Sequence, residues 1–367
     1  MIKSSILPIL NLICLSILGC FDTITNRQVK AMNVTLKDIA KLCGVSVATV
    51  SLVLNNKPNR ISESTKKKII DTAKELHYHP NPMALSLVTR KSHVLGLIIP
   101  DVSNLFYTEF IRQVELEAAK YGYTIILGNT DEQGSREYDY VRTFLQRGLA
   151  GCILIHSSID MEKYDTKIVE LVKQSKLPFV LIDRQQKASN IKTLFIDQEL
   201  GAYLATTHLL NLGHTKIGYI SGQLDLDLSK MRYAGYKRAL EEHNVAFDEN
   251  LVEFGDWRPE GGHQAGLRLI AKGVSGIFAA NDMMAFGVYQ AAFSMALRIP
   301  QDLSVIGFDD VSFASVVTPG LTTINQPMRQ VGIDCVTMLV EMITKKVSES
   351  YKQYTPTLTV RGSTSRK

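Results

Sequence analysis

The sequence predicts a small all-α segment near the N-terminus and a larger α/β domain of parallel sheets after it. Two short amphipathic helices joined by a glycine turn fall within residues 35–55. From residue 94 onward, short runs that are apolar on both faces alternate with amphipathic helical stretches, as in parallel strands covered by helices. With 367 residues, of which 45% are hydrophobic, the chain can build more than one substantial core.

The first predicted helix starts at Thr35, whose side chain can cap it. Its apolar face consists of Leu36, Ile39, Ala40 and Leu42. Gly44 stands where the chain has to leave this helix with a positive φ angle. A second helix follows, with Ser46 as its cap and Val50, Val53 and Leu54 on its buried face. This is the helix-turn-helix pattern, in which the second helix has the size to enter the DNA major groove.

A third helix is expected to begin at Ser62 and to bring further apolar residues to the same core: Ile69, Ile70, Ala73 and Leu76. Between residues 32 and 91 there are ten lysines and arginines against four acidic residues, although the whole chain has a net charge of only +5. A compact basic segment on a slightly acidic body is typical of a nucleic-acid binder with a separate regulatory part. After this helix, Asn81 and Pro82 can start a short helix over residues 82–88, which is too short to be stable alone.

Together these elements resemble the headpiece and hinge of regulators of the lac-repressor family. The resemblance rests on the run from Thr35 to Asn55, on Tyr78 with Pro80 and Asn81, and on Ala84 with Leu87. In that family the hinge helices of two subunits pair in the minor groove, and a leucine from each wedges between base pairs. The resemblance therefore implies that Leu87 is the wedge and that Ala84 lies in the contact between hinges. The DNA-binding residues that it implies are Thr35, Ser46, Val47, Ala48, Thr49, Ser51, Leu52, Asn55, Asn81, Ala84 and Leu87.

The implied base-reading positions are apolar in this sequence. Val47 and Ala48 can touch thymine methyl groups, but they cannot form bidentate hydrogen bonds with a base. We therefore expect sequence readout to depend on thymine contacts, on Thr49 and Asn55, and on the bend that the hinge induces. For Leu52, a role as partial core is as compatible with the sequence as a base contact.

The large domain carries its polar residues at the ends of the predicted strands. Parallel sheets bind ligands beyond the carboxyl ends of their strands, and the residues at those ends are Asp101, Asn129, Asp131, Asp183, Asn281 and Asp309. The sequence contains no phosphate-binding glycine loop, no His-Glu-x-x-His and no Gly-x-Ser-x-Gly motif. Its histidines and cysteines show no metal-ligand spacing either. We therefore predict no catalytic residue, no metal and no cofactor.

From residue 93 onward the chain resembles a type I periplasmic sugar-binding protein, as does the regulatory domain of the lac-repressor family. The segments that carry the resemblance are residues 212–217, 232–240, 280–282, 307–310 and 321–327. It implies two parallel-sheet subdomains, three crossing segments and an effector cleft between them. The effector-binding residues that it implies are Phe106, Tyr107, Asp183, Arg232, Trp257, Asn281 and Asp309.

The resemblance assigns these residues different roles. Arg232 would be the central cation, facing sugar hydroxyls or an acidic group, and Trp257 would stack on the ligand. Phe106 and Tyr107 would form the opposite apolar wall. A structural ion pair for Arg232 and a plain core position for Trp257 are the alternatives. Asp282 and His214 are interpreted as structural.

Residues 1–31 have the pattern of a lipoprotein-type secretion signal, because an apolar run from Ile6 to Leu18 precedes Cys20. A DNA-binding segment begins directly after Met32, however, and export would separate it from DNA. We therefore interpret Met32 as the start of the protein and the preceding stretch as a leader or non-native extension. A membrane-tethered regulator and an exported protein are the alternatives. The five cysteines form no Cys-x-x-Cys pair, which fits a reduced cytosol.

The expected organisation has four parts: residues 1–31 as leader, 32–80 as helix-turn-helix domain, 81–92 as hinge helix and linker, and 93–367 as effector-binding and dimerisation domain. The expected function is an effector-responsive cytoplasmic transcriptional regulator of carbohydrate or related metabolite genes, most simply a repressor. As partners we expect double-stranded operator DNA of pseudo-palindromic sequence, a sugar or related metabolite and a second copy of the chain, but no membrane. The alternative function is an exported sugar-binding lipoprotein, and an enzyme on this scaffold is a third hypothesis.

Overall fold

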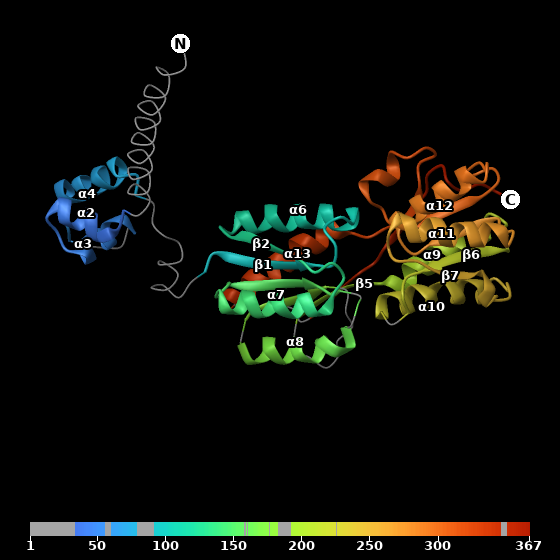
Figure 1. Ribbon diagram of the computed structural model, residues 1–367, viewed down its shortest axis with the longest axis horizontal. Coiled ribbons are helices and arrows are strands. Elements are labelled where there is room, and N and C mark those ends of the chain that lie inside the picture. The colour runs from blue at the N-terminus through green and yellow to red at the C-terminus, as the bar shows by residue number, and fades with distance from the viewer. Residues whose placement is uncertain are drawn as a thin grey trace, which may run out of the picture. The chain divides into compact units, whose positions relative to one another are not determined.

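The computed structural model describes residues 34–55, 60–78, 92–157, 159, 161–175, 177–182, 192–224, 226–345 and 351–367. The chain divides into two compact units, residues 1–91 and residues 92–367 (Figure 1). The expected leader and four of the expected site residues lie outside the described residues: Asn81, Ala84, Leu87 and Asp183.

The first unit contains the three predicted helices: α2 (Leu36–Cys43), α3 (Val47–Leu54) and α4 (Glu63–Glu75). Ile39, Val50 and Ile69, one from each helix, form the centre of their common core. Gly44 ends α2 with a φ of 70°, as predicted, and Ser46 caps α3 by accepting a hydrogen bond from the Thr49 N–H at 3.0 Å. At the start of α2, the N–H and the hydroxyl of Thr35 both donate to the Asp38 carboxylate. These bonds hold the pKa of Asp38 below its usual value.

Two residues that we predicted for this core lie on the surface instead. Leu42 is 61% exposed and Ile70 is 39% exposed. Each helix turns by about 100° per residue, so a buried stripe through Ile39 and Cys43 leaves Leu42 to one side. Ile70 is rotated away from Ile69 by the same angle. The helical spacing of the apolar residues was therefore predicted correctly, but the predicted buried face extended one residue too far to the side.

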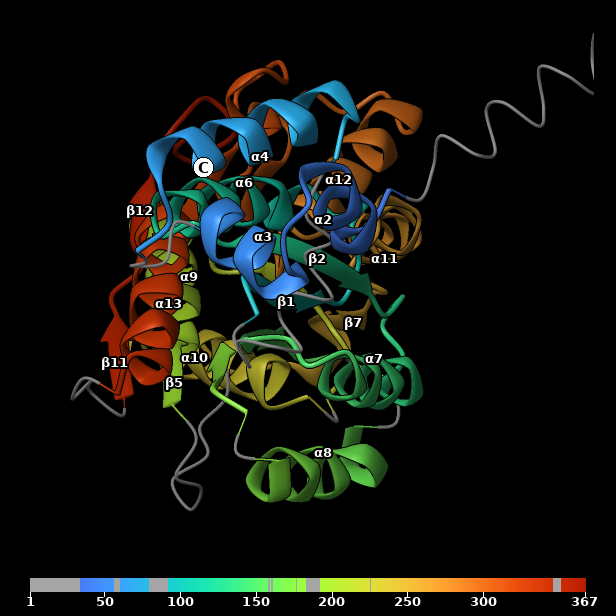
Figure 2. The same cartoon turned by 90° about the vertical axis from the view of Figure 1, so that its left-hand side faces the viewer.

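The second unit consists of two lobes, each built on a six-stranded sheet. In the N-terminal lobe the sheet order is β11-β5-β4-β3-β1-β2 and every neighbouring pair is parallel. The strands are β1 (Val94–Ile99), β2 (Thr124–Asn129), β3 (Gly151–Ile155), β4 (Phe179–Ile182), β5 (Lys192–Ile196) and β11 (Tyr351–Tyr354). α6 (Leu105–Lys120) and α13 (Met328–Ile343) cover one face, while α7 (Gly134–Gln146) and α8 (Met161–Ser175) cover the other (Figure 2).

The C-terminal lobe repeats this plan with the sheet order β12-β10-β9-β8-β6-β7. Its strands are β6 (Ile217–Ser221), β7 (Val252–Phe254), β8 (Gly276–Ala279), β9 (Ser304–Asp309), β10 (Thr322–Asn325) and β12 (Thr357–Thr359). Only β12 runs antiparallel to its neighbour. The helices pack in two pairs, α9 (Gln198–Asn211) with α10 (Asp227–Glu242) and α11 (Pro259–Ala271) with α12 (Asp282–Ser294). Short 3-10 turns, η1 (Glu249–Leu251) and η2 (Ser312–Ser315), complete the lobe.

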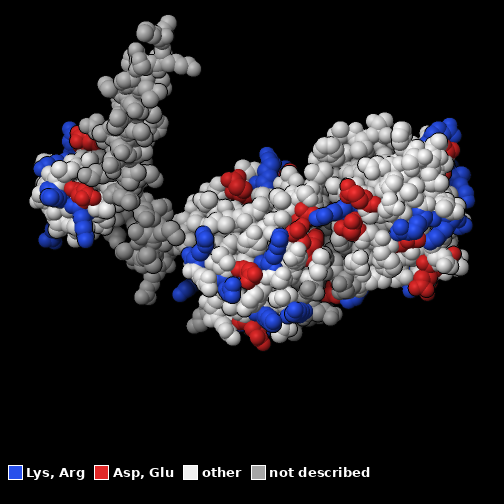
Figure 3. Space-filling model, in the orientation of Figure 1, with Lys and Arg blue, Asp and Glu red and all other residues white. Residues whose placement is uncertain are grey.

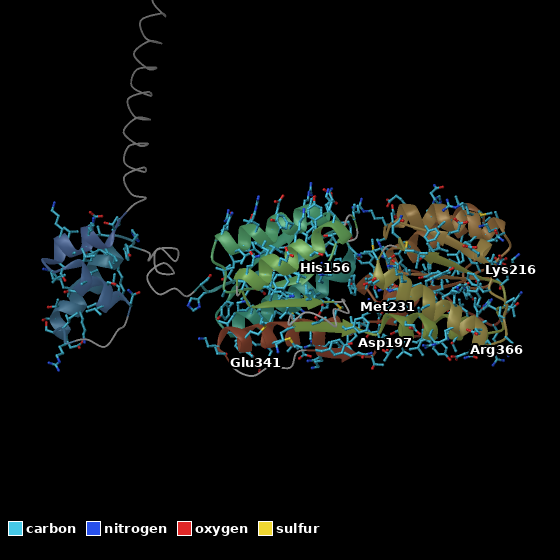
Figure 4. All side chains as sticks on the ribbon, turned by 90° about the horizontal axis from the view of Figure 1, so that it is seen from below. His156, Asp197, Lys216, Met231, Glu341 and Arg366 are labelled. Atoms are coloured by element: carbon cyan, nitrogen blue, oxygen red, sulfur yellow. The ribbon has the colours of Figure 1, made fainter. Side chains whose placement is uncertain are left out.

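The chain passes between the lobes three times, as the resemblance implied. The crossings connect β5 to α9 at Asp197, β10 to α13 at Gln326 and β11 to β12 at residues 355–356. Asp197 lies between the lobes in Figure 4. This topology directs the loops that follow the strands of both sheets toward the junction of the lobes. Of the described helices, none has the length and apolar character needed to cross a membrane.

We predict that Ile39→Ala destabilises the first unit by about 2–5 kcal/mol, because it leaves a cavity in the core. Leu42→Ala on the same helix is the matched control and should change stability by less than about 0.5 kcal/mol. Hydrogen exchange of peptides from α2, α3 and α4 measures the opening free energy of this unit within the full chain. Equal effects of the two substitutions would contradict the observed helix register.

Candidate nucleic-acid interface and ligand cleft

The exposed side of α3 carries the residues predicted to face DNA. Ser46, Val47 and Ala48 are exposed, and Thr49, Ser51, Leu52 and Asn55 are half-buried. Leu52 is not among the apolar residues that pack on the core of this unit, in contrast to Leu54. This favours the interpretation of Leu52 as a surface contact over that of a core residue.

Two of the predicted polar DNA contacts also stabilise α3 itself. The hydroxyl of Thr49 lies 2.8 Å from that of Ser46, and the Asn55 amide donates to the backbone oxygen of Ser51 at 2.8 Å. These bonds hold the polar side chains of α3 against its own backbone and cap, beside the exposed apolar residues Val47 and Ala48. Basic side chains lie on the surface of the same unit (Figure 3), and the exposed ones include Lys37, Lys41, Lys67 and Lys68. Exposed lysines on this unit suit binding to phosphates, and the apolar Val47 and Ala48 can form no base-specific hydrogen bonds.

A cavity of about 560 Å³ lies where the two lobes of the second unit meet. It is lined from the N-terminal lobe by Asp101, Ser103, Asn104, Asp131 and Glu132, and from the C-terminal lobe by Asp256, Trp257, Arg258, Pro259, Glu260 and Met283. Acidic and basic side chains gather at this junction in Figure 3. Five of the lining side chains are acidic and one is an arginine. The rim of the cavity is therefore strongly acidic.

Arg258 connects the two lobes across this cavity. Its guanidinium donates from the C-terminal lobe to Asp101 at 3.1 Å and to Asp131 at 3.4 Å, both in the N-terminal lobe. Burial raises the pKa of Asp101. Hydrogen bonds from Ser103 and the ion pair with Arg258 lower it by more than burial raises it, so the pKa of Asp101 lies below its usual value. Arg258 was not predicted from the sequence, although a charged residue directly after the only tryptophan was a visible signal.

Arg232 is buried, with only 4% of its surface exposed, and its guanidinium has partners on several sides. Its Nε donates to the Gln198 side chain at 2.9 Å, and its NH1 donates to the backbone oxygen of Ala280. Its NH2 lies 3.7 Å from the Asp309 carboxylate. The ring of Phe308 packs against the guanidinium at 3.7 Å. The ion pair that we considered as the alternative role of Arg232 is thus present, and Arg232 is not among the residues that line the cavity.

Trp257 lies beside Arg232, whose guanidinium carbon is 5.7 Å from the centre of the indole ring. Trp257 lines the cavity and has a φ of 68°, an uncommon backbone conformation for a bulky residue. The Asn281 side chain holds this turn by donating to the backbone oxygen of Trp257 at 3.0 Å. The indole lies so close to Gly222 that a Cβ there would be 2.0 Å from the ring. The position of the tryptophan therefore requires glycine at residue 222.

None of the other described residues that we predicted as ligand contacts is among the residues that line the cavity. Phe106 packs against the cores of both lobes and so lies at their junction. Tyr107 is buried in the core of the N-terminal lobe, because successive residues on α6 point in different directions. Asn281 caps α12 by accepting from the Met284 N–H at 2.9 Å, in addition to its bond with Trp257. Asp309 has a φ of 122°, which marks a strained backbone beside Arg232. Their contacts with an effector stay predictions.

Asp282 and His214 have the structural partners that we expected. Asp282 is fully buried and accepts hydrogen bonds from the Thr323 hydroxyl at 2.5 Å and the Val311 N–H at 2.9 Å. Burial and repulsion by Asp309 raise its pKa well above the usual value. His214 joins Ser275 to the C-terminal segment, and burial lowers its pKa. Within the described ranges, no group of three or more His, Cys, Asp or Glu residues is arranged to hold a metal ion.

Comparison with known proteins gives two matching family profiles. Residues 35–81 match "Bacterial regulatory proteins, lacI family", and residues 206–364 match "Periplasmic binding protein-like domain". The chain is 37% identical to a ribose operon repressor of Halalkalibacterium halodurans, over 90% of this chain and 97% of that protein.

Two solved structures are also similar. One is a lac repressor dimer bound to operator and an anti-inducer, with a TM-score of 0.79 and 26% identity over 90% of this chain and 99% of that one. The other is a complex of the transcriptional regulator CelR with cellobiose, with a TM-score of 0.67 and 26% identity over 90% and 100% of the two chains.

We predict that Asp282→Asn reduces the loss of stability that occurs as the pH rises. Because the pKa of Asp282 is raised above 3.8 in the folded protein, the folded state keeps a proton that the unfolded chain has lost. This contribution is complete at low pH and disappears as the pH approaches the folded pKa. An asparagine can keep both bonds by accepting from Val311 and donating to the Thr323 hydroxyl.

Thermal melts between about pH 4 and pH 8 measure the difference between parent and variant. Exposed Asp227→Asn is the control and should follow the parent. Identical pH slopes for the parent and Asp282→Asn would contradict the assignment.

Proposed function

Because the chain belongs to the lacI family of bacterial regulatory proteins, we propose that it acts as a homodimer on a pseudo-palindromic operator and releases or binds DNA according to an effector in the lobe cleft. The observation that carries the proposal is the pairing, in one chain, of a helix-turn-helix unit with a two-lobed body that has a cavity at the lobe junction. Trp257 lines this cavity, and the buried Arg232 packs beside Trp257. We further propose repression of carbohydrate or related metabolite genes in the cytoplasm.

Exposed apolar side chains on the second unit support the homodimer. Ile126 and Leu127 are exposed on β2, which is the edge strand of its sheet. In the C-terminal lobe, Phe313 and Val316 are exposed on and directly after η2, Val316 by 70%. Apolar surface of this kind is typical of protein–protein interfaces. A two-fold dimer presents two α3 helices, which matches a palindromic operator.

The composition of the cleft supports an uncharged effector with several hydroxyl groups. Trp257 offers an aromatic face in the lining of the cavity, and the carboxylates of the rim offer acceptors for hydroxyl groups. The acidic rim, with five carboxylates and one arginine, would repel a phosphate ester or a carboxylate during entry. We therefore propose a neutral sugar as the effector class.

Operator binding can be tested by selecting bound sequences from random duplex DNA. We expect enrichment of a palindrome, with an affinity that falls steeply as salt rises because phosphate contacts release counterions. Leu87→Ala should weaken the best site at least about tenfold if Leu87 is the wedge. Leu42→Ala, an exposed leucine of the same unit, should not weaken it. If no sequence is enriched with or without a panel of neutral sugars, the proposed function is wrong.

Effector class can be tested by the fluorescence of Trp257, which is the only tryptophan of the chain. We expect ribose, cellobiose or another neutral sugar to change the emission, and the matching phosphate ester to bind at least about tenfold more weakly. Neutralising the rim by Asp131→Asn with Glu132→Gln should reduce this difference. Tighter binding of the ester than of the free sugar would contradict the proposed class.

A further inference from the structure

Two buried glutamines join two of the segments that cross between the lobes. Gln198 is the first residue of α9, directly after the crossing from β5, and Gln326 lies in the crossing from β10 to α13. They are 1% and 4% exposed. The Gln198 amide donates to the side-chain oxygen of Gln326 at 3.1 Å, although the two residues are 128 positions apart in the chain. One hydrogen bond thus connects two crossings that have to move when the lobes rotate.

The two glutamines are also bonded to the predicted effector residues. The Nε of Arg232 donates to the other end of Gln198 at 2.9 Å, and the amide of Gln326 donates to Oδ1 of Asp309 at 2.7 Å. The same Asp309 oxygen lies 3.7 Å from NH2 of Arg232. The four side chains therefore form a closed ring, and each comes from a different segment of the fold.

The chemistry of the ring allows only one orientation of each amide. A guanidinium can only donate hydrogen bonds and an ionised carboxylate can only accept them. Gln198 must therefore turn its oxygen to Arg232 and its nitrogen to Gln326, and Gln326 must turn its nitrogen to Asp309. Reversal of either amide would place donor against donor or acceptor against acceptor in a buried site, where an unmade hydrogen bond is costly. The hydrogen bonds therefore run in one fixed direction, from the Arg232 guanidinium through Gln198 and Gln326 to the Asp309 carboxylate.

We propose that Gln198 and Gln326 are positioning residues that couple the orientation of Arg232 and Asp309 to the relative placement of the two crossing segments. A rotation of the lobes that separates the glutamines releases Nε of Arg232 and Oδ1 of Asp309 from their fixed directions. Closure restores the ring and orients both groups. The inference rests on the proposed function in one respect, since it takes Arg232 and Asp309 as effector ligands.

The test uses Gln326→Glu in the full-length, effector-free protein. A protonated glutamic acid has nearly the shape of glutamine and can still donate to Asp309, whereas an ionised one cannot. Burial and the neighbouring Asp309 carboxylate should both raise the pKa of the introduced glutamate. The ring should therefore be intact in this variant at low pH and broken at high pH.

Trp257 fluorescence reports the state of the ring, because the Arg232 guanidinium lies 5.7 Å from the indole. We expect the emission of Gln326→Glu to match that of the parent at about pH 5 and to depart from it at about pH 8. The parent provides the baseline at each pH, which accounts for titration of the neighbouring Asp282. Gln113→Glu is the matched control, because Gln113 is also a buried glutamine but lies on α6 within the N-terminal lobe. This control should show no pH-dependent departure.

A double-substitution cycle gives a second, independent measurement. Gln198→Leu and Gln326→Leu should each change the emission, and the double variant should change it no more than the larger single effect, because both act through one ring. Additive effects, or a Gln326→Glu emission that follows the parent at every pH, would overturn the proposal. Neither readout requires an effector, so failure of the sugar panel leaves this result unaffected. With a sugar that binds the parent, Gln326→Glu should bind about tenfold more weakly at high pH only.

Discussion

The burial of the Arg232 guanidinium is the constraint on which the arrangement of the cleft depends. A charge with so little solvent contact has to be paired and fully hydrogen-bonded. Gln198, the Ala280 carbonyl and Asp309 meet this requirement, and each belongs to a different strand end or crossing segment. The same guanidinium packs on Phe308 and lies beside Trp257. Satisfying one buried cation thus brings together the residues that line and support the site.

Much of this fold follows from local patterns that a sequence displays directly. Gly44 and Ser46 fix the turn between α2 and α3, because a positive φ and a helix cap each favour particular residue types. Runs that are apolar on both faces identified the parallel strands. In the helices, the apolar pattern did not identify every inward-facing residue correctly. Leu42 and Ile70 were predicted to be buried, but each lies beside the buried face of its helix.

The candidate site was harder to predict, because its decisive contacts join distant segments. The resemblance supplied Arg232, Trp257 and Asp309, but nothing in the sequence pairs Gln198 with Gln326, and a glutamine near a strand end has no distinctive local signal. Arg258 reaches across the lobes to Asp101 and Asp131, a contact that depends on how two sheets face each other. Only tertiary structure specifies that geometry.

The close contact between Trp257 and Gly222 has a consequence for how this site can change over generations. Any side chain at residue 222 would displace the indole, and with it the neighbour of the buried cation. The charged side chains of Asp131 and Glu132 are only half-buried, in the loop that follows β2. New ligand preferences can therefore arise more easily by substitution of side chains at the mouth of the cavity than by substitution at Gly222 beneath the indole.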